Sequence, residues 1–337
     1  IGSLAEKALK SNGLIQPKDC ETRTFLHDLP VIDQFCPDRI IHVLKKRKSV
    51  IIAPGPGDKA FKGPAIIAHG TVSPEQGFVT ISSVCFASFI KFFTDYQEAL
   101  QQDIATMDDH HLFDAVTPFL EPIQKGSPKF IRSPFPDEET VYSAIIEAGK
   151  KTVEYGLVDS FFGNVSYFWN QTLYISQTGS SLDELSGCID PVPVDGSTSA
   201  GLTASSELCA HLETIGLTGC KAILHGHPKF SVILSMDCNP AEKAVCNFNA
   251  QCHIKCPKKR FVGSIPIVPG EVGTGRFGLC NTLPRALIQT NAAIVYGHGL
   301  FTIGKNNFSD AFQTMLAVEN LCYNAYFKKV QALRKTL

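Results

Sequence analysis

The chain has 337 residues, which is enough for two domains that each bury a hydrophobic core. Its 31 Lys and Arg residues nearly balance its 32 Asp and Glu residues, so the overall charge favours neither a nucleic acid nor a strongly anionic membrane as partner. No run of about 18 uninterrupted apolar residues is present, and the first residues lack the basic-then-apolar pattern of a secretory signal. We therefore expect a soluble, cytoplasmic protein with no nucleic-acid and no membrane partner.

Twelve cysteines are many for this length, but their spread does not resemble a small secreted disulfide scaffold. In the cytoplasm most of them would stay reduced. Cys238, Cys246, Cys252 and Cys256 fall within 19 residues, yet their separations of 8, 6 and 4 miss the paired Cys-x-x-Cys of a zinc ribbon. Packing thiols are favoured there, and a second metal site is the open alternative.

We expect residues 1–136 to form a smaller α/β N-terminal domain of unassigned role. Asp108-Asp109-His110-His111 could suggest a metal site there, but a solvated loop or the start of a helix is favoured. The apolar patterns predict a short helix, two strands and a Phe-rich helix, over 39–46, 50–53, 65–68 and 86–100.

The second of these strands is followed by His69-Gly70 and a long helix. A similar order occurs near the end of the chain, where an apolar strand precedes His298-Gly299 and a helix follows. One interpretation is a degenerate second copy of the last third of the C-terminal domain. The motifs that precede His298 have no counterpart before His69, so we favour coincidence and expect His69 to bind no metal.

Three prolines in ten residues, SPKFIRSPFP at 127–136, predict a linker and place a second domain over 137–337. The first elements predicted in this domain are an amphipathic helix and a β-hairpin, over 138–155 and over 160–169 with 171–176.

An acidic residue stands at the start of the next predicted helix. Ser205 and Ser206 offer hydroxyls that can cap a helix beginning near Glu207. Glu207 would then lie in the first helical turn, close to backbone N–H groups that attract anions.

Two histidines end the strand that follows. The apolar run Ala222-Ile223-Leu224 leads into His225-Gly226-His227, and residues i and i+2 of a strand point to the same face. Two imidazoles can therefore meet one metal ion. A lone His-x-His is a weak signal, and such pairs are more often ordinary core histidines.

A third histidine changes that balance. The apolar strand at 293–295 is followed by Gly297-His298-Gly299, and glycine on both sides allows a metal or ligand to approach closely. Three histidines and a carboxylate are a plausible zinc set with room for substrate.

The motifs Gly163-Asn164-Val165-Ser166, Thr178-Gly179, Ser205-Ser206-Glu207, His225-x-His227 and His298-Gly299 stand in this order along the chain. In this order they resemble the class II aldolase/adducin family, specifically its fuculose-1-phosphate aldolase branch. The resemblance implies a three-layer αβα domain with a central, mainly antiparallel sheet over 137–337, and a homo-oligomer, since the family often forms tetramers.

The resemblance also implies a role for each motif. His225, His227 and His298 would bind Zn²⁺ or another divalent transition metal, and Glu207 would be the acid/base. The residues that match the family's substrate-phosphate site are Gly163, Asn164, Thr178, Gly179, Ser205 and Ser206. Hydroxyls, an amide and a helix N-terminus can bind phosphate without formal charge.

The implied activity is a metal-dependent lyase, most directly the reversible cleavage of a ketose 1-phosphate to dihydroxyacetone phosphate and an aldehyde. A methylthioribulose-phosphate dehydratase-like enzyme, which eliminates water at a similar site, is an alternative. A pentulose-phosphate 4-epimerase is less favoured, because those enzymes carry Asp where Glu207 stands. An adducin-like interaction module would have lost the metal ligands, which are all present here.

One segment departs from the family pattern. His227 and His298 are 71 residues apart, and residues 239–283 between them are longer and richer in cysteine than expected. We expect a loop near the site at 268–275, with Glu271 as an additional polar group.

Overall fold

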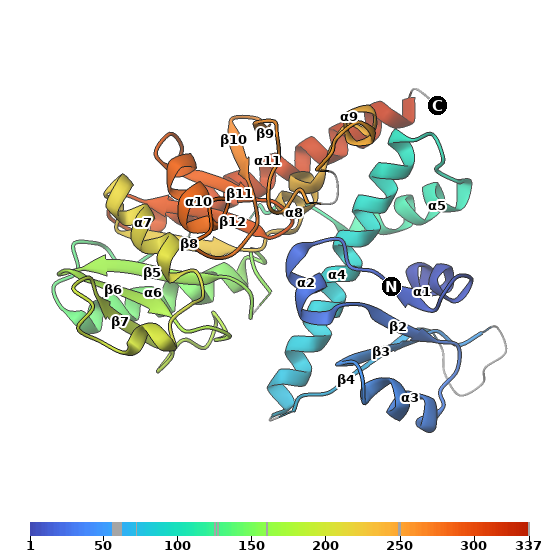
Figure 1. Ribbon diagram of the computed structural model, residues 1–337, viewed down its shortest axis with the longest axis horizontal. Coiled ribbons are helices and arrows are strands. Elements are labelled where there is room, and N and C mark those ends of the chain that lie inside the picture. Colours follow the sequence, from blue (N-terminus) through green and yellow to red (C-terminus); the bar gives the residue numbers. More distant parts are fainter. Residues whose placement is uncertain are drawn as a thin grey trace. The chain divides into compact units, whose positions relative to one another are not determined.

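A computed structural model describes residues 1–55, 63–71, 73–124, 126, 128–159, 161–248 and 251–335. The chain divides into two compact units, Ile1–Gln97 (unit 1) and Glu98–Leu337 (unit 2), which we describe separately (Figure 1). The units meet within a helix, whereas the catalytic domain predicted from the sequence begins at residue 137. That domain boundary stays a prediction.

Unit 1 contains a small mixed sheet and four helices. In chain order its elements are α1 (Gly2–Leu9), β1 (Leu14–Ile15), α2 (Cys20–Leu26), β2 (Leu29–Ile32), α3 (Pro37–Leu44), β3 (Ser49–Ile52), β4 (Ala65–Ala68) and α4 (Pro74–Gln101), whose last residues belong to unit 2. The strands lie in the order β1-β2-β3-β4. The β2/β3 pair is parallel, and the two outer pairs are antiparallel.

The sheet of unit 1 is buried on both faces because β3 alternates its side chains between two clusters. Val50 and Ile52 pack with Ile40 of α3, while Ile51 packs with α1 and with Val84 of α4. A continuous apolar strand is typical of this two-sided burial.

Within the described part of the chain, α4 is the one helix whose length and composition would allow it to cross a membrane. Its most apolar window has a mean hydropathy of 1.5, and 50% of that window is buried inside the structure. Val84, Phe86 and Ile90 are among its buried residues. The core helix of a soluble protein has the same properties, so a single such helix is weak evidence of a membrane span.

Unit 2 contains a larger sheet. Its elements are α5 (Met107–Val116), the 3₁₀ turn η1 (Thr117–Phe119), α6 (Glu138–Glu154), β5 (Asn164–Trp169), β6 (Thr172–Ser176), β7 (Ile189–Pro193), η2 (Ala200–Leu202), α7 (Leu208–Thr218), β8 (Ala222–Gly226), α8 (Lys229–Met236), α9 (Pro240–Ala244), β9 (Arg260–Val262), β10 (Ile265–Val268), α10 (Leu279–Leu287), β11 (Ala292–Val295), β12 (Gly299–Gly304) and α11 (Phe308–Lys335).

The eight strands lie in the order β7-β6-β5-β8-β12-β11-β10-β9. Only β10 and β11 run parallel, and the other neighbouring pairs are antiparallel. The predicted α/β class is therefore confirmed, with a mixed sheet. β8 lies between β5 and β12, which places His225 inside the sheet and His227 just beyond the end of the strand.

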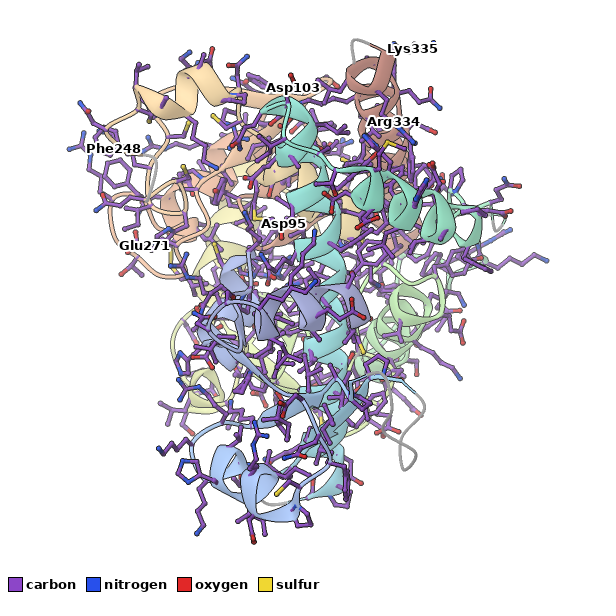
Figure 2. All side chains as sticks on the ribbon, turned by 90° about the vertical axis from the view of Figure 1, so that its right-hand side faces the viewer. Asp95, Asp103, Phe248, Glu271, Arg334 and Lys335 are labelled. Atoms are coloured by element: carbon purple, nitrogen blue, oxygen red, sulfur yellow. A yellow bond between two sulfur atoms is a disulfide. The ribbon has the colours of Figure 1, made fainter. Side chains whose placement is uncertain are left out.

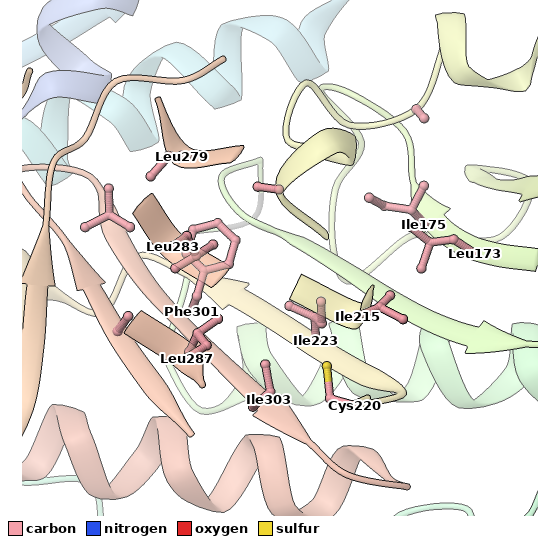
Figure 3. Packing of buried hydrophobic residues seen from close by; sticks show 14 of the residues in the cluster. Leu173, Ile175, Ile215, Cys220, Ile223, Leu279, Leu283, Leu287, Phe301 and Ile303 are labelled. Carbon is pink, nitrogen blue, oxygen red and sulfur yellow. The ribbon is translucent and has the colours of Figure 1, made fainter. Parts of the chain in front are cut away.

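The core over one face of this sheet comes from α7 and α10 (Figure 3). Leu279, Leu283 and Leu287 of α10 recur every four residues, so they share one face of the helix and point at the strands. Phe301 and Ile303 of β12 meet them from the sheet. On the other side of the strands, α6 contacts β5, and α11 contacts β8, β11 and β12.

The outer end of α11 is attached to α5. The guanidinium of Arg334 donates two hydrogen bonds, of 2.6 and 2.8 Å, to the carboxylate of Asp114 (Figure 2). At the start of α5, Thr106 and Asp109 form a reciprocal capping box, which explains why the acidic segment at 108–111 begins a helix.

Candidate active site

The His-x-His motif lies at the end of β8, a strand in the interior of the sheet. His225 is opposite Asn164 of β5 on one side and Phe301 of β12 on the other. His227 follows β8 and leads directly into α8. Both neighbouring strands therefore fix the direction of the His225 side chain.

Three imidazoles converge there. The Nε2 atom of His225 lies 3.1 Å from Nε2 of His227 and 3.2 Å from Nε2 of His298. All three rings are buried, and one ligand atom from each lies within 4.8 Å of the others. The structure thus brings together the three predicted metal ligands, including one that is 71 residues distant in sequence.

The protonation states of His225 and His227 suit metal binding. Burial and, secondarily, the neighbouring imidazoles hold the pKa of His225 and of His227 well below the usual value, so both rings are neutral at pH 7. The Nδ1 atom of His225 lies 3.2 Å from the carbonyl oxygen of Leu300, which can only accept a hydrogen bond. Nδ1 therefore carries the proton, and Nε2 directs its lone pair into the cluster.

Glu207 closes the cluster from the start of α7. It occupies the N-cap position, immediately before the first helical residue, so the predicted first turn is displaced by one residue. Its carboxylate oxygens lie 3.3 Å from Nε2 of His298 and 3.6 Å from Nε2 of His225. The side chain is buried.

The amide of Asn164 orients that carboxylate. Its Nδ2 donates hydrogen bonds of 2.6 Å to Glu207 and 3.0 Å to the hydroxyl of Ser205. The hydroxyl of Ser205 also lies 3.3 Å from the backbone N–H of Glu207. The Oδ1 atom of Asn164 is buried and has no hydrogen-bond partner among the described residues, so it is available to a bound group.

The other residues of the predicted phosphate site lie in two adjoining segments. The backbone N–H and hydroxyl of Thr178 donate to the carbonyl oxygens of Thr203 and Ala204, at 3.0 and 2.9 Å. This pairing places the end of β6 beside the chain that leads to Ser205. Thr178, Gly179 and Ser206 are at least partly exposed, so a ligand can reach them.

Gly163 has a steric reason to be glycine. Its φ is +80°, and a Cβ there would collide with the carbonyl oxygen of His225. Gly299 is restricted in the same way, since a Cβ would lie 2.7 Å from the ring of His225 and 2.9 Å from that of His227. Both glycines allow the backbone to approach the histidines closely.

Two phenylalanines that the sequence analysis did not select position the rings. Phe301 stacks on His225 with ring centroids 3.8 Å apart, and Phe162 stacks on His227 at 5.1 Å. Stacking on both rings restricts their rotation. The alternation of residues in the strand after His298 is the signal that could have found Phe301.

α8 is held from both ends by side chains that sequence analysis also missed. Glu319 of α11 accepts hydrogen bonds from the backbone N–H groups of Phe230 and Ser231, at 2.8 and 2.9 Å, at the start of α8. Burial raises the pKa of Glu319 to about 7. The hydroxyl of Ser235 accepts a 2.8 Å hydrogen bond from the N–H of Gly297. These contacts connect the turns that carry His227 and His298.

A second polar pair lies beneath the site. The hydroxyl of Ser166 is 2.7 Å from Nδ1 of His211, and the ring of His211 meets Phe301 edge-on. Burial lowers the pKa of His211 to about 3, so this ring is neutral at pH 7. Within the described residues it belongs to the support under Phe301 and His225 and lies outside the metal cluster.

A disulfide between Cys209 and Cys280 joins α7 to α10. The sequence analysis expected mostly reduced thiols and did not identify this pair, because the two cysteines are 71 residues apart. The other cysteines of the described chain form no disulfide, and those at 238, 246, 252 and 256 do not form a metal-ligand group there. Glu271, expected near the site, is exposed on the outer side of its loop (Figure 2).

The donor set fits a divalent transition metal. The lone pairs of ring nitrogens and of a carboxylate oxygen that face one another repel each other unless protons or a cation lie between them. Imidazole sets of this kind bind zinc and related metals. The fold and this cluster together define a class of α/β protein with a buried cluster of three histidines that could hold a metal ion.

Comparison with known families agrees with this class. The sequence profile described as Class II Aldolase and Adducin N-terminal domain matches residues 143–326, more than half of the chain. The chain therefore belongs to the class II aldolase and adducin family, as its motifs predicted. None of the curated proteins compared with the sequence matches it.

Several solved structures are similar to part of this chain at low identity. The L-fuculose-1-phosphate aldolase from Thermus thermophilus is 21% identical, with 58% of this chain and 97% of that chain covered and a TM-score of 0.46. YgbL from Escherichia coli, a putative aldolase/epimerase/decarboxylase, is 18% identical, with coverages of 58% and 98% and a TM-score of 0.41. At these values the likeness carries no argument about activity.

Proposed function

We propose that the chain is a divalent-metal-dependent lyase that acts on a phosphorylated sugar. The reaction proposed is reversible aldol cleavage of a ketose 1-phosphate to dihydroxyacetone phosphate and an aldehyde. One observation carries the proposal: the carboxylate of Glu207 lies 3.3 and 3.6 Å from two histidines of the buried three-histidine cluster. A metal centre and an adjacent acid/base are the two parts that such a reaction needs.

The metal would be held by His225, His227 and His298, and zinc is the ion we propose. A zinc ion bound by three neutral imidazoles keeps its double charge and can polarise a carbonyl group. The proton on Nδ1 of His225 keeps Nε2 free for this role, and the stacked Phe301 holds the ring in place.

Glu207 is the proposed acid/base. In the cleavage direction, the hydroxyl beyond the scissile carbon–carbon bond loses its proton and becomes the aldehyde. The carbon that leaves within dihydroxyacetone phosphate gains a proton. Glu207 can carry this proton because its carboxylate is buried, oriented by Asn164 at 2.6 Å, and adjacent to the cluster.

The substrate phosphate is proposed to bind at the two adjoining segments beside Glu207. These contribute the hydroxyls of Thr178 and Ser206, the backbone at Gly179, and the start of α7. Gly163, Asn164 and Ser205 complete the proposed set. The exposure of Gly179 and Ser206 supports this role, since a phosphate needs hydrogen-bond donors that it can reach.

Three further properties belong to the same proposal. They are a catalytic domain over 137–337, a homo-oligomer, and action in the cytoplasm on a small phosphorylated sugar, with neither a nucleic acid nor a membrane as partner.

Metal content and product release together test the proposal. Elemental analysis of the wild-type chain should give about one zinc per chain, and His225→Ala should lose it. His69→Ala in unit 1 is the matched control and should keep the metal. The wild type should release dihydroxyacetone phosphate from ketose 1-phosphates. Metal without that product would point to a dehydratase or another lyase, and a chain without metal would contradict the proposal and favour an adducin-like binding role.

A further inference from the structure

Unit 1 repeats the strand order of the last part of unit 2. The strands β1-β2-β3-β4 and β9-β10-β11-β12 both pair in the sequence antiparallel, parallel, antiparallel. A helix, α3 or α10, lies between the second and third strands of each set. Each set is followed by a helix of 28 residues, α4 or α11.

The two segments also agree in individual hydrogen bonds. The backbone N–H of Ala53, after β3, donates to the carbonyl of Ile32 in β2 at 2.9 Å. At the equivalent place, the N–H of Tyr296, after β11, donates to the carbonyl of Val268 in β10 at 2.9 Å.

The last strands match in the same way. The N–H of His69, after β4, donates to the carbonyl of Lys48 at 3.1 Å, just before β3. The N–H of Ile303 in β12 donates to the carbonyl of Asn291 at 3.0 Å, just before β11. His69 therefore corresponds to Ile303 and has no relation to His298.

A glycine follows each of these residues for the same steric reason. A Cβ on Gly70 would collide with the carbonyl oxygen of Ser73, and a Cβ on Gly304 would collide with that of Asn307. In both units this glycine lies four residues before the first residue of the long helix. The two segments thus share one framework, with a different alignment from the His-Gly echo in the sequence.

The shared framework lacks a metal site in unit 1. The counterpart of His298 falls between β3 and β4, where residues 55–64 read GPGDKAFKGP and contain no histidine. The described part of unit 1 also has no fifth strand in the place of β8. This explains why His69 has no partner histidines and supports its assignment as a non-ligand.

Among the described residues, no strand pairs with the outer edge of β4 in unit 1. In unit 2, β12 pairs with β11 along one edge and with β8 along the other. β4 pairs with β3 only and is the last strand of its sheet. An open edge presents unpaired N–H and C=O groups that another strand can bind.

The long helices show the same difference. Phe312 and Met315, the fifth and eighth residues of α11, are 0% exposed. The fifth and eighth residues of α4 are Phe78 and Ile81, which are 58% and 37% exposed. Cys85, one turn further along, is also exposed. Residues 78, 81 and 85 form an apolar stripe, since i, i+3 and i+7 share one face of a helix.

In unit 2, the segments around α6 and β8 cover the equivalent stripe. The ring of Phe312 packs against Tyr155, just after α6, at 5.0 Å, and Met315 lies beneath Gly226 of β8. In unit 1 we define the corresponding surface as the β4–α4 face, made of Ala65–Ala68 with Phe78, Ile81 and Cys85.

We propose that two copies of this chain associate through the β4–α4 face, with the two β4 strands pairing antiparallel. The β8 of this chain cannot fill the position, because both of its edges are already paired. A second copy supplies a strand of the same chemistry: β4 reads Ala-Ile-Ile-Ala, and β8 begins Ala-Ile-Leu. One two-fold contact closes both open edges and covers both stripes.

The β4 strand carries no charged side chain, which native edge strands commonly use to prevent such pairing. The stripe on α4 then adds apolar area beside the new strand pair. Antiparallel pairing of β4 with its copy reproduces the direction of the β12/β8 pair in unit 2.

Sedimentation of the full chain over a concentration series tests this contact. Phe78→Glu and Ile81→Glu should halve the mass of the largest species, because each places a charge in the contact. Ile41→Glu is the matched control, since Ile41 is 51% exposed on α3 outside this face, and it should leave the mass unchanged. Unchanged mass in the Phe78 and Ile81 variants, or a wild type that stays monomeric, would overturn the proposal.

Hydrogen exchange of the wild type gives a second test that needs no variant. Raising the concentration through the association range should slow exchange in the peptides that contain β4 and residues 78–85. Protection confined to unit 2 would overturn the proposal, because it would show that copies meet elsewhere.

Discussion

Unit 1 and the last part of unit 2 share an arrangement of four strands and a long helix, yet among the described residues only unit 2 contains the histidine cluster. The difference lies in what is added to the framework: β5 with Asn164, the start of α7 with Glu207, and β8 with its two histidines. The shared part contributes only His298, in the turn between two of its strands. The comparison of the two units shows that the four shared strands and the long helix do not by themselves produce the histidine cluster.

The largest effect should come from the acid that unit 1 lacks. Glu207→Gln should lower turnover by about a thousandfold or more, because the amide cannot exchange the proton, while most of the metal is kept. Glu213→Gln, an exposed acid on the same helix, is the control and should have ordinary turnover. Full activity of the Glu207 variant in a steady-state assay would exclude that residue from the mechanism.

Reduction of the disulfide should destabilise unit 2 and leave unit 1 unchanged. The Cys209–Cys280 bond closes a loop of 71 residues, which corresponds to about 4 kcal/mol of unfolding free energy in the chain-entropy picture. Trp169 in β5 is the single tryptophan, so its fluorescence reports on unit 2 in urea unfolding. The double variant Cys209→Ser with Cys280→Ser should be insensitive to reductant, and an equal response in that variant would contradict the assignment.

Each unit buries a carboxyl group at a helix start, and the two should respond to pH in overlapping windows. Burial raises the pKa of Glu319 to about 7 and that of Asp19 to about 6. The folded state then holds more protons than the unfolded state between the ordinary and the raised pKa. Stability therefore falls as pH rises, from about 4.5 to about 7 for Glu319 and from about 4 to about 6 for Asp19.

For Glu319 this loss is roughly 3 kcal/mol. Urea unfolding followed by Trp169 at pH 5 and pH 7.5 should show it in the wild type, and Glu319→Gln should remove the pH dependence. A slope that persists in the variant would assign the effect to another group. Asp19→Asn is the corresponding test in unit 1, where hydrogen exchange can replace fluorescence as the measurement.

The smallest effect concerns the proposed phosphate site, which unit 1 also lacks. Ser206→Ala should raise KM for phosphorylated substrates by about tenfold, the equivalent of one lost hydrogen bond of about 1.4 kcal/mol, with kcat unchanged. Asn164→Ala should raise KM and also lower kcat, because Asn164 orients Glu207. Equal effects of Ser206→Ala on phosphorylated and unphosphorylated sugars would contradict the phosphate assignment.

Sequence patterns predicted those parts of unit 2 that local chemistry determines. The α/β class, the helix at 138–154, the hairpin of β5 and β6, and the strand that ends in His-x-His follow from periodicity and turn residues. The three histidines and Glu207 came from motif order, and the structure brings all four together. The position of these residues in the chain was sufficient to predict that they belong to one site, because each motif ends or begins a predicted helix or strand.

Tertiary contacts determined the rest. Glu319 resembles a surface acid on a long helix, and only the packing of α8 against α11 makes it a buried cap. Cys209 and Cys280 give no local signal for their bond. The sequence also did not reveal that unit 1 repeats the strand order of the last part of unit 2. The His69-Gly70 motif suggested an alignment with His298-Gly299, whereas strand pairing aligns His69 with Ile303, and no short sequence pattern contains this pairing.

The central place of β8 has a consequence for how the protein is made. Its histidines leave the ribosome before His298, and β12 must close a loop of more than seventy residues before it reaches β8. A nascent or truncated chain that ends before His298 carries two of the three proposed metal ligands, and under the proposed function it should bind metal weakly. Tight metal binding would then mark the completion of unit 2, and metal content would measure the fraction of molecules that have finished folding.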